Sequence, residues 1–239
     1  MENILILHGW GSCSQNWQRV KQGLEAGGYR VFVPDLPGFG ESPPPPRPWS
    51  IDDYVKWVRE YCGKNHLPRF FLLGHSFGGR VAIKFAVAHP ESILGLILVS
   101  AGGAEASETL ANLKKKVLRG ISPVVKKFSF LPGYSFFRKG FYRLILRKTD
   151  YLEARGVMKE TFRKVIAESL IPYLPQIKNK TLIIWGRKDR LLPLREGILM
   201  KERIPNAEIK ILENINHNPQ TEAPELLVEK ILENLPCIF

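Results

Sequence analysis

The sequence lacks the features of a membrane or secreted protein. None of its apolar runs approaches the roughly 20 residues that a membrane-spanning helix needs. The first apolar run, residues 4–7, is too short and wrongly flanked for a signal peptide. The chain also has no internal repeat. We therefore expect a soluble, cytoplasmic protein.

Cysteine is scarce as well. Cys13, Cys62 and Cys237 are odd in number and widely separated, and no two of them form a C-x-x-C pair. This pattern argues against a disulfide framework and favours a reducing, cytoplasmic setting. No cluster of His, Cys and Asp has the spacing of a metal site, so we expect neither a metal nor another cofactor.

Acidic residues are few relative to basic ones. The chain has 23 Asp and Glu against 35 Lys and Arg, which gives a formal net charge of +12. Residues 102–177 hold 15 Lys and Arg against 6 Asp and Glu, so nine of the excess positive charges lie in this segment. No nucleic-acid-binding motif accompanies them. The segment either presents a solvated basic face or contacts an acidic lipid surface or an acidic carrier protein.

The rest of the sequence alternates short apolar strands with amphipathic helices, which predicts an α/β fold with a mostly parallel sheet of about six strands and helices on both faces. Strands are expected at residues 4–7, 29–34, 70–73, 93–100, 181–186 and 207–212, and helices at 14–25, 50–61, 81–88, 194–203 and 224–235. Between residues 104 and 177 there are only basic helical runs, at 108–119, 134–148 and 152–169. We therefore expect a core of residues 1–103 and 178–239, with a helical cap inserted at 104–177.

The motif G-x-S-x-G occupies residues 74–78, between an apolar strand and a helix-forming run. A strand that turns directly into a helix strains the residue at the turn, and Gly74 and Gly78 remove side chains that would collide with it. The Ser76 hydroxyl then lies at a helix N-terminus, where free N–H groups favour negative charge. Ser76 is therefore the candidate nucleophile, with a glycine-rich structural turn as the alternative.

A serine hydroxyl needs a base to take up its proton and an acid to orient that base. Of the five histidines, His217 alone follows the last predicted strand, at an edge from which a loop can reach Ser76. Taken in isolation, His217 has the pattern of a surface histidine. In a chain with a serine at such a turn, it is the candidate base.

Asp189 is the candidate acid. It stands just past a strand end, 28 residues before His217, and hydrolases of this arrangement place the acid before the base. A turn aspartate between two basic residues is the alternative interpretation. Glu213 is a rival acid, but it comes directly off the last strand, so close to His217 that its reach is awkward.

Several motifs together resemble one family. They are H-G-W-G at residues 8–11, D-L-P-G-F-G-E-S at 35–42, G-H-S-F-G-G at 74–79, W-G-R-K-D at 185–189, and H-N-P at 217–219 with E-A-P-E at 222–225. In this order they resemble the α/β-hydrolase superfamily, over nearly all of the chain outside the predicted cap. The H-G-W-G loop is similar to that of pimeloyl-carrier-protein methyl ester esterases and of meta-cleavage-product hydrolases.

The resemblance implies Ser76 as nucleophile, Asp189 as acid and His217 as base, with an oxyanion hole formed by the backbone N–H groups of Trp10 and Phe77. It implies a cofactor-free serine hydrolase that cleaves small-molecule carboxylic esters of small to medium acyl chain, lactones included. Carbon–carbon hydrolases of ring-cleavage products, cofactor-free peroxidases and carrier-protein ester esterases share this triad and stay open. A ligand-binding protein on a hydrolase scaffold is the alternative that is not an enzyme.

The chain departs from the family pattern in two places. Its first predicted strand is the one that leads into the oxyanion loop, so we expect a sheet without the family's usual N-terminal antiparallel hairpin. The exposed sheet edge that this leaves favours pairing, and we expect a monomer or a homodimer. Asn216 stands where a glycine commonly precedes the base.

Overall fold

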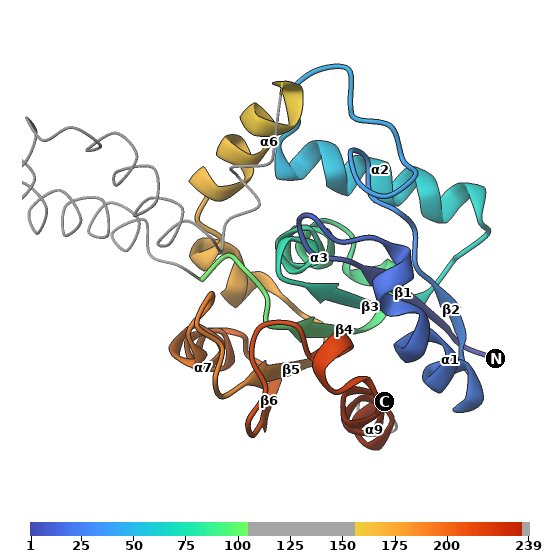
Figure 1. The fold of residues 1–239 in the computed structure, drawn as a ribbon, viewed down its shortest axis with the longest axis vertical. Helices are drawn as coiled ribbons and strands as arrows, with labels where there is room; N and C mark the ends of the chain where they lie inside the picture. Colours follow the sequence, from blue (N-terminus) through green and yellow to red (C-terminus); the bar gives the residue numbers. More distant parts are fainter. Residues whose placement is uncertain (105–155, 236–239) are drawn as a thin grey trace, which may run out of the picture.

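The computed structural model describes residues 1–104 and 156–235, which form one six-stranded sheet with helices on both faces (Figure 1). The strands are β1 (Asn3–Leu7), β2 (Arg30–Phe32), β3 (Phe70–His75), β4 (Ile93–Val99), β5 (Thr181–Gly186) and β6 (Ala207–Leu212). The helices are α1 (Gln18–Ala26), α2 (Ile51–Lys64), α3 (Phe77–Ala88), α6 (Gly156–Ala167), α7 (Leu194–Arg203), α8 (Pro219–Glu222) and α9 (Pro224–Asn234). Short 3₁₀ helices are η1 (Ser14–Trp17), η2 (Pro90–Ser92) and η4 (Ile171–Gln176). The predicted α/β fold is confirmed.

The strands lie in the order β2-β1-β3-β4-β5-β6, and every neighbouring pair is parallel. The chain therefore runs outward from β1 to β2, returns to β3 on the other side of β1, and continues to β6. In open parallel sheets, ligands bind outside the carboxyl ends of the strands at such a reversal of strand order. The topology thus marks the loops that follow β1 and β3 as the place for a site.

Two hydrophobic cores lie on the two faces of the sheet, because successive strand side chains point to opposite faces. Leu5 and Leu7 of β1 belong to the core beneath α2, α3 and α7. Ile4 and Ile6 belong to the other core, with residues of α1 and α9. Figure 1 shows α1 and α9 together on one side of the sheet and α2 and α3 on the other. Continuous apolar strands are thereby buried on both faces.

Several predicted elements differ from the observed ones, among them the helix expected at 81–88, which begins at Phe77 as α3. The strand expected at 29–34 is only three residues long, because β2 is an edge strand that pairs with β1 alone and Pro34 has no N–H to extend the ladder. Helix α2 begins after Ser50, whose side chain forms a capping box with Asp53, and it continues to Lys64 rather than ending at residue 61. Within the described ranges, no helix has the length and apolarity to cross a membrane.

Helix α6 falls within the predicted run 152–169, whereas the runs expected at 108–119 and 134–148 lie outside the described residues. The Thr161 hydroxyl of α6 accepts a hydrogen bond from the Trp49 N–H at 3.0 Å. Around the C-terminal end of α6, the Arg80 guanidinium of α3 donates to the carbonyl groups of Val165 and Glu168, at 3.2 and 3.0 Å. These contacts fix α6 over the helix that follows Ser76.

Candidate active site

Ser76 lies in the turn between β3 and α3, with φ +51° and ψ −111°. A non-glycine residue rarely adopts a positive φ, and this strain persists only where neighbours hold the turn. The Ser76 N–H donates to the Val99 carbonyl at 3.2 Å, and its carbonyl accepts from the N–H groups of Gly79 and Gly102 at 3.1 and 3.0 Å. The backbone of Ser76 is thus fixed on both sides.

The glycines of the motif are required by close approach of the backbone. A Cβ on Gly74 would lie 2.6 Å from the carbonyl oxygen of Gly78, and a Cβ on Gly78 would lie 2.0 Å from that of Leu7. Both distances are far below van der Waals contact, and neither backbone oxygen can move aside cheaply. The close approach at Gly74 is within the turn, as the sequence predicted, whereas Gly78 packs against the end of β1, which the sequence did not indicate.

The structure brings Ser76, His217 and Asp189 together. Nε2 of His217 lies 3.0 Å from the Ser76 Oγ, and its Nδ1 lies 2.7 Å from Oδ2 of Asp189. The Asp189 side chain is fully buried, and its Oδ1 accepts from the N–H groups of Leu191 and Leu192 at 2.8 and 2.9 Å. A carboxylate only accepts, so Nδ1 of His217 carries the proton and the Nε2 lone pair faces the serine hydroxyl.

Glu213, the rival acid, is placed elsewhere. Both of its carboxylate oxygens accept from Nε of Arg187, at 2.7 and 2.6 Å, and the two side chains are mostly exposed. Asp189 is also a turn aspartate, since its Oδ1 caps the two N–H groups that follow it in the chain. The two interpretations of Asp189 are therefore compatible: one oxygen holds the turn and the other holds His217.

His8 holds the loop after β1 in one orientation. Its buried Nε2 accepts from the Leu36 N–H at 3.0 Å, so the proton is on Nδ1, which donates to the Gly9 carbonyl at 2.8 Å. Burial lowers the pKa of His8 and keeps the ring neutral. The Gly9 carbonyl and the Trp10 N–H point in opposite directions from one planar peptide unit. By holding that carbonyl, His8 fixes the direction of the Trp10 N–H.

The N–H groups of Trp10 and Phe77 are available to a ligand. In residues 1–104 and 156–235, neither of them has a hydrogen-bond acceptor. Phe77 is the first residue of α3, where backbone N–H groups are left free by the helix geometry. The structure therefore leaves free the two donors that the sequence resemblance indicated.

Aromatic rings surround these two residues. The Trp10 ring lies edge-on to the rings of Phe39, Phe77 and Phe162, with centroids 4.8, 5.2 and 4.9 Å away. Phe39 follows β2 and Phe162 belongs to α6, so four separate segments contribute to this cluster. We call these four residues the aromatic wall. Sequence patterns did not indicate it, because its members are spread over more than 150 positions.

Asp35 secures the loop that contributes Phe39. Its two carboxylate oxygens accept from the N–H groups of Ser14 and Glu41, at 2.6 and 3.0 Å. Burial acts to raise the pKa of Asp35, but these hydrogen bonds outweigh it and the pKa is lowered. The hydrogen bonds therefore favour the charged carboxylate of Asp35, which links the segment after β2 to η1.

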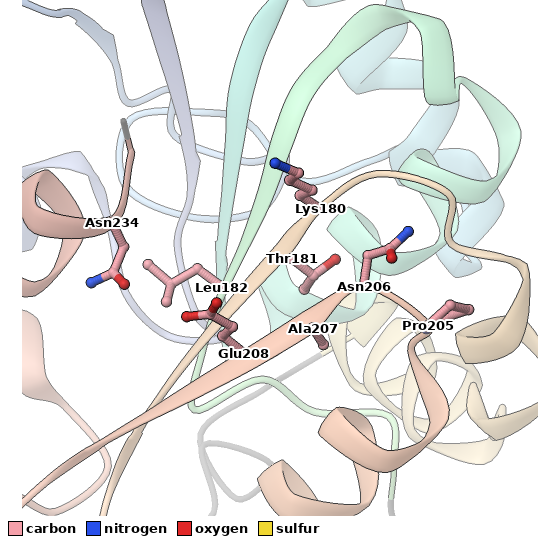
Figure 2. Close-up of a pocket in the computed structure, with 8 residues that line it drawn as sticks. All are labelled: Lys180, Thr181, Leu182, Pro205, Asn206, Ala207, Glu208 and Asn234. Atoms are coloured by element: carbon pink, nitrogen blue, oxygen red, sulfur yellow. The ribbon is translucent and has the colours of Figure 1, made fainter. Parts of the chain in front are cut away.

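A cavity of about 300 Å³ lies at the amino-terminal ends of β5 and β6 (Figure 2). It is lined by Lys180, Thr181, Leu182, Pro205, Asn206, Ala207, Glu208 and Asn234. Thr181 and Ala207 begin β5 and β6, whereas Asp189 follows the end of β5. Because the strands are parallel, the cavity and Ser76 lie at opposite ends of the strands. This cavity is not the one from which Ser76 would take a substrate.

Known proteins resemble this chain over most of its length. Residues 2–224 match the family model of the alpha/beta hydrolase fold. A 2-hydroxy-6-oxononadienedioate/2-hydroxy-6-oxononatrienedioate hydrolase of Cupriavidus pinatubonensis is 28% identical, over 92% of this chain and 82% of its own. Lipase 1 of Psychrobacter immobilis is 27% identical, over 93% of this chain and 73% of its own. The crystal structure of a membrane phospholipase A, a bacterial virulence factor, matches with a TM-score of 0.72 at 25% identity, over 99% of this chain and 79% of that one. The chain therefore belongs to the α/β hydrolase fold family and is a hydrolase.

Proposed function

We propose that the protein is a serine hydrolase that cleaves carboxylic esters of small to medium acyl chain, lactones included. One observation carries the proposal, namely the unbroken line of hydrogen bonds from Asp189 through His217 to Ser76. In this line the base has its lone pair toward the hydroxyl and its proton toward a buried carboxylate. That is the arrangement by which a serine becomes a nucleophile at neutral pH.

In the first half of the reaction, the Ser76 Oγ attacks the ester carbonyl carbon while its proton passes to Nε2 of His217. The electrons of the carbonyl bond move to its oxygen, which accepts hydrogen bonds from the Trp10 and Phe77 N–H groups. Each such donor contributes about 3 kcal/mol to the barrier reduction. The intermediate then expels the alcohol, which takes the proton from Nε2, and an acyl group stays on Ser76.

In the second half, a water molecule gives a proton to Nε2 of His217 and attacks the acyl carbon. The intermediate returns that proton to the Ser76 Oγ as the carboxylic acid leaves. His217 is a cation in both halves, and Asp189 opposes that charge at 2.7 Å. The cycle balances with water alone and needs no cofactor.

The aromatic wall supports an apolar acyl group in the substrate. Trp10 contributes both a free N–H and a partly exposed ring, so an acyl chain bound to Ser76 would leave the oxyanion site along aromatic carbon. Aromatic rings bind aliphatic chains through buried apolar area, at roughly 25 cal/mol per Å². We therefore expect kcat/KM to rise with acyl length from acetate to hexanoate.

A second candidate is the hydrolysis of a carbon–carbon bond in a ring-cleavage product. The relative from Cupriavidus pinatubonensis supports this, because its name gives a hydrolase of a 2-hydroxy-6-oxo dienedioate and most of both chains align. The same Ser76, His217 and Asp189 would serve it. A screen of p-nitrophenyl esters, an aryl lactone and a 2-hydroxy-6-oxo dienoate compares the candidates directly, and the substrate with the highest kcat/KM decides between them.

The test of the serine mechanism is Ser76→Ala. Removing the nucleophile should lower turnover of p-nitrophenyl butyrate by at least about 1,000-fold, with unchanged circular dichroism. Ser92→Ala is the matched control, since Ser92 lies in η2 beyond the far end of α3 and contacts Arg59. Equal turnover by wild type and Ser76→Ala would contradict the serine mechanism, and no turnover of any substrate by either protein would favour the ligand-binding alternative.

A further inference from the structure

The loop that presents His217 lies between β6 and α8, and its backbone is held from two directions. Oε2 of Glu222 accepts from the N–H and the side-chain amide of Asn216, at 2.8 and 2.9 Å, and Oε1 accepts from the Asn218 N–H at 3.1 Å. From the other direction, Nε2 of His75 lies 2.9 Å from the carbonyl oxygen of His217.

The contacts meet on a single peptide unit. The carbonyl of His217 and the N–H of Asn218 are the two polar ends of one planar amide, and they point in opposite directions. His75 holds the carbonyl end and Glu222 holds the N–H end. We call this amide the clamped peptide. Its orientation determines the direction in which the Cα–Cβ bond of His217 leaves the backbone, and hence where the imidazole lies.

His75 is built as a permanent donor. A carbonyl oxygen only accepts, so Nε2 of His75 carries the proton. Its Nδ1 is buried and has no hydrogen-bond partner within the described residues. Burial, with His217 nearby, lowers the pKa of His75 to about 3, while Asp189 and His8 act in opposite directions and more weakly. A Cβ on Gly9 would lie 2.8 Å from Nδ1, so the ring also packs against the oxyanion loop.

We infer that His75 and Glu222 are positioning residues for His217, acting together through the clamped peptide. This inference rests on the proposed function. The Nε2 to Oγ distance of 3.0 Å is at hydrogen-bond length, so a small rotation of the amide would carry the base out of reach. A displacement of about 1 Å in a catalytic group lowers the rate by about 100-fold.

The experiment compares kcat and KM for p-nitrophenyl butyrate in four variants. His75→Leu removes the N–H donor to the His217 carbonyl and keeps an apolar side chain of similar size. His75→Gln keeps an N–H donor close to the position of Nε2. Glu222→Gln replaces one of the two carboxylate oxygens with an NH₂ group, which cannot accept from the N–H groups of Asn216 and Asn218. We expect kcat to fall about 10- to 100-fold in His75→Leu and Glu222→Gln, with KM within about twofold. His75→Gln should restore kcat to within about fivefold of wild type. The double variant His75→Leu/Glu222→Gln should be within about threefold of the worse single variant, because both ends hold one amide.

Matched controls are His89→Gln, at the opposite end of α3, and Glu225→Gln, whose carboxylate pairs with Arg19 on the surface. Both should keep wild-type kcat. Amide hydrogen exchange of Asn218 is a readout that does not depend on activity, and it should quicken in Glu222→Gln but not in Glu225→Gln. This readout decides the inference if His75→Leu does not fold or if wild type has no Ser76-dependent turnover.

Each remaining outcome has one meaning. Unchanged kcat and Asn218 exchange in Glu222→Gln would overturn the clamp and leave the proposed function standing. If the fold-losses of kcat in the two single variants multiply in the double variant, His75 and Glu222 act separately, and their joint action through the clamped peptide is overturned. A wild type without Ser76-dependent turnover, but with Asn218 exchange that depends on Glu222, would overturn the proposed function and keep the clamp as structure.

Discussion

Asp189→Asn tests the protonation states that the geometry assigns to the site. Oδ1 of Asp189 accepts from the N–H groups of Leu191 and Leu192, so in the variant the amide oxygen must take that place. An amide NH₂ there would face two donors. The NH₂ therefore faces Nδ1 of His217 and donates to it, which moves the imidazole proton to Nε2. In that form His217 cannot accept the proton of Ser76.

The expected loss is about 10⁴-fold in kcat, the size seen when a triad imidazole is held in the wrong tautomer. That loss corresponds to about 5.5 kcal/mol in the activation barrier. Because Asn has the shape of Asp and keeps the two turn hydrogen bonds, the free energy of unfolding in urea should change by no more than about 1 kcal/mol. Activity would thus be lost while the fold stays intact.

The assay is single-substrate kinetics on p-nitrophenyl butyrate, with Glu213→Gln as the control for loss of a carboxylate near His217. Glu213 is exposed and pairs with Arg187, so its variant should keep kcat within about twofold. An Asp189→Asn enzyme within tenfold of wild type would refute the assigned tautomer. An equal loss in Glu213→Gln would show that the rival acid contributes.

Four further substitutions test the stability of the fold. Gly78→Ala should lower the free energy of unfolding by about 2–4 kcal/mol and abolish activity, because its Cβ would lie 2.0 Å from the Leu7 carbonyl oxygen. Gly63→Ala, which has open space around its Cβ, should raise the free energy of unfolding by about 0.5–1 kcal/mol. Both values are measured by unfolding in urea. Lys84→Met should cost about 1–2 kcal/mol in the same measurement, since it leaves the partly buried Glu168 carboxylate without its 2.7 Å ion pair. Burial acts to raise the pKa of Glu222, but the hydrogen bonds from Asn216 and Asn218 outweigh it and lower the pKa below 4.5. The charged carboxylate therefore stabilises the fold above pH 4.5, and this stabilisation is lost as the pH falls through the lower pKa of the folded state. The melting temperature of Glu222→Gln should accordingly depend less on pH between about 3 and 5 than that of wild type.

The sheet and the place of Ser76 could be predicted because their causes are local in sequence. Strands buried on both faces appear as continuous apolar runs, and a glycine two positions before and after a serine marks a turn packed against its neighbours. The bounds expected for the helix at 194–203 and the strand at 207–212 agree with the structure. Each of these elements is specified within a window of a few residues.

Other parts of the site depend on contacts between distant residues. His75 and the His217 carbonyl are 142 positions apart, and no pattern near either residue indicates that they meet. In the sequence, His8 and His75 appear only as members of two family motifs, with no role indicated for either. Glu222 was part of a family motif without a stated role, since its task appears only when α8 brings it beneath the loop. The aromatic wall was missed for the same reason.

The neutral state of the buried histidines affects the energy of catalysis. His217 becomes a cation in each half of the proposed reaction, and the ring of His75 lies 5.1 Å from it. A like charge at that distance would cost about 3 kcal/mol at an effective dielectric constant of 20. With a pKa of about 3, His75 is uncharged at neutral pH, and the lone pair of His8 is occupied by the Leu36 N–H. The stabilisation that Asp189 gives to the His217 cation is therefore not offset by a positive charge on His75 beside it, nor by one on His8.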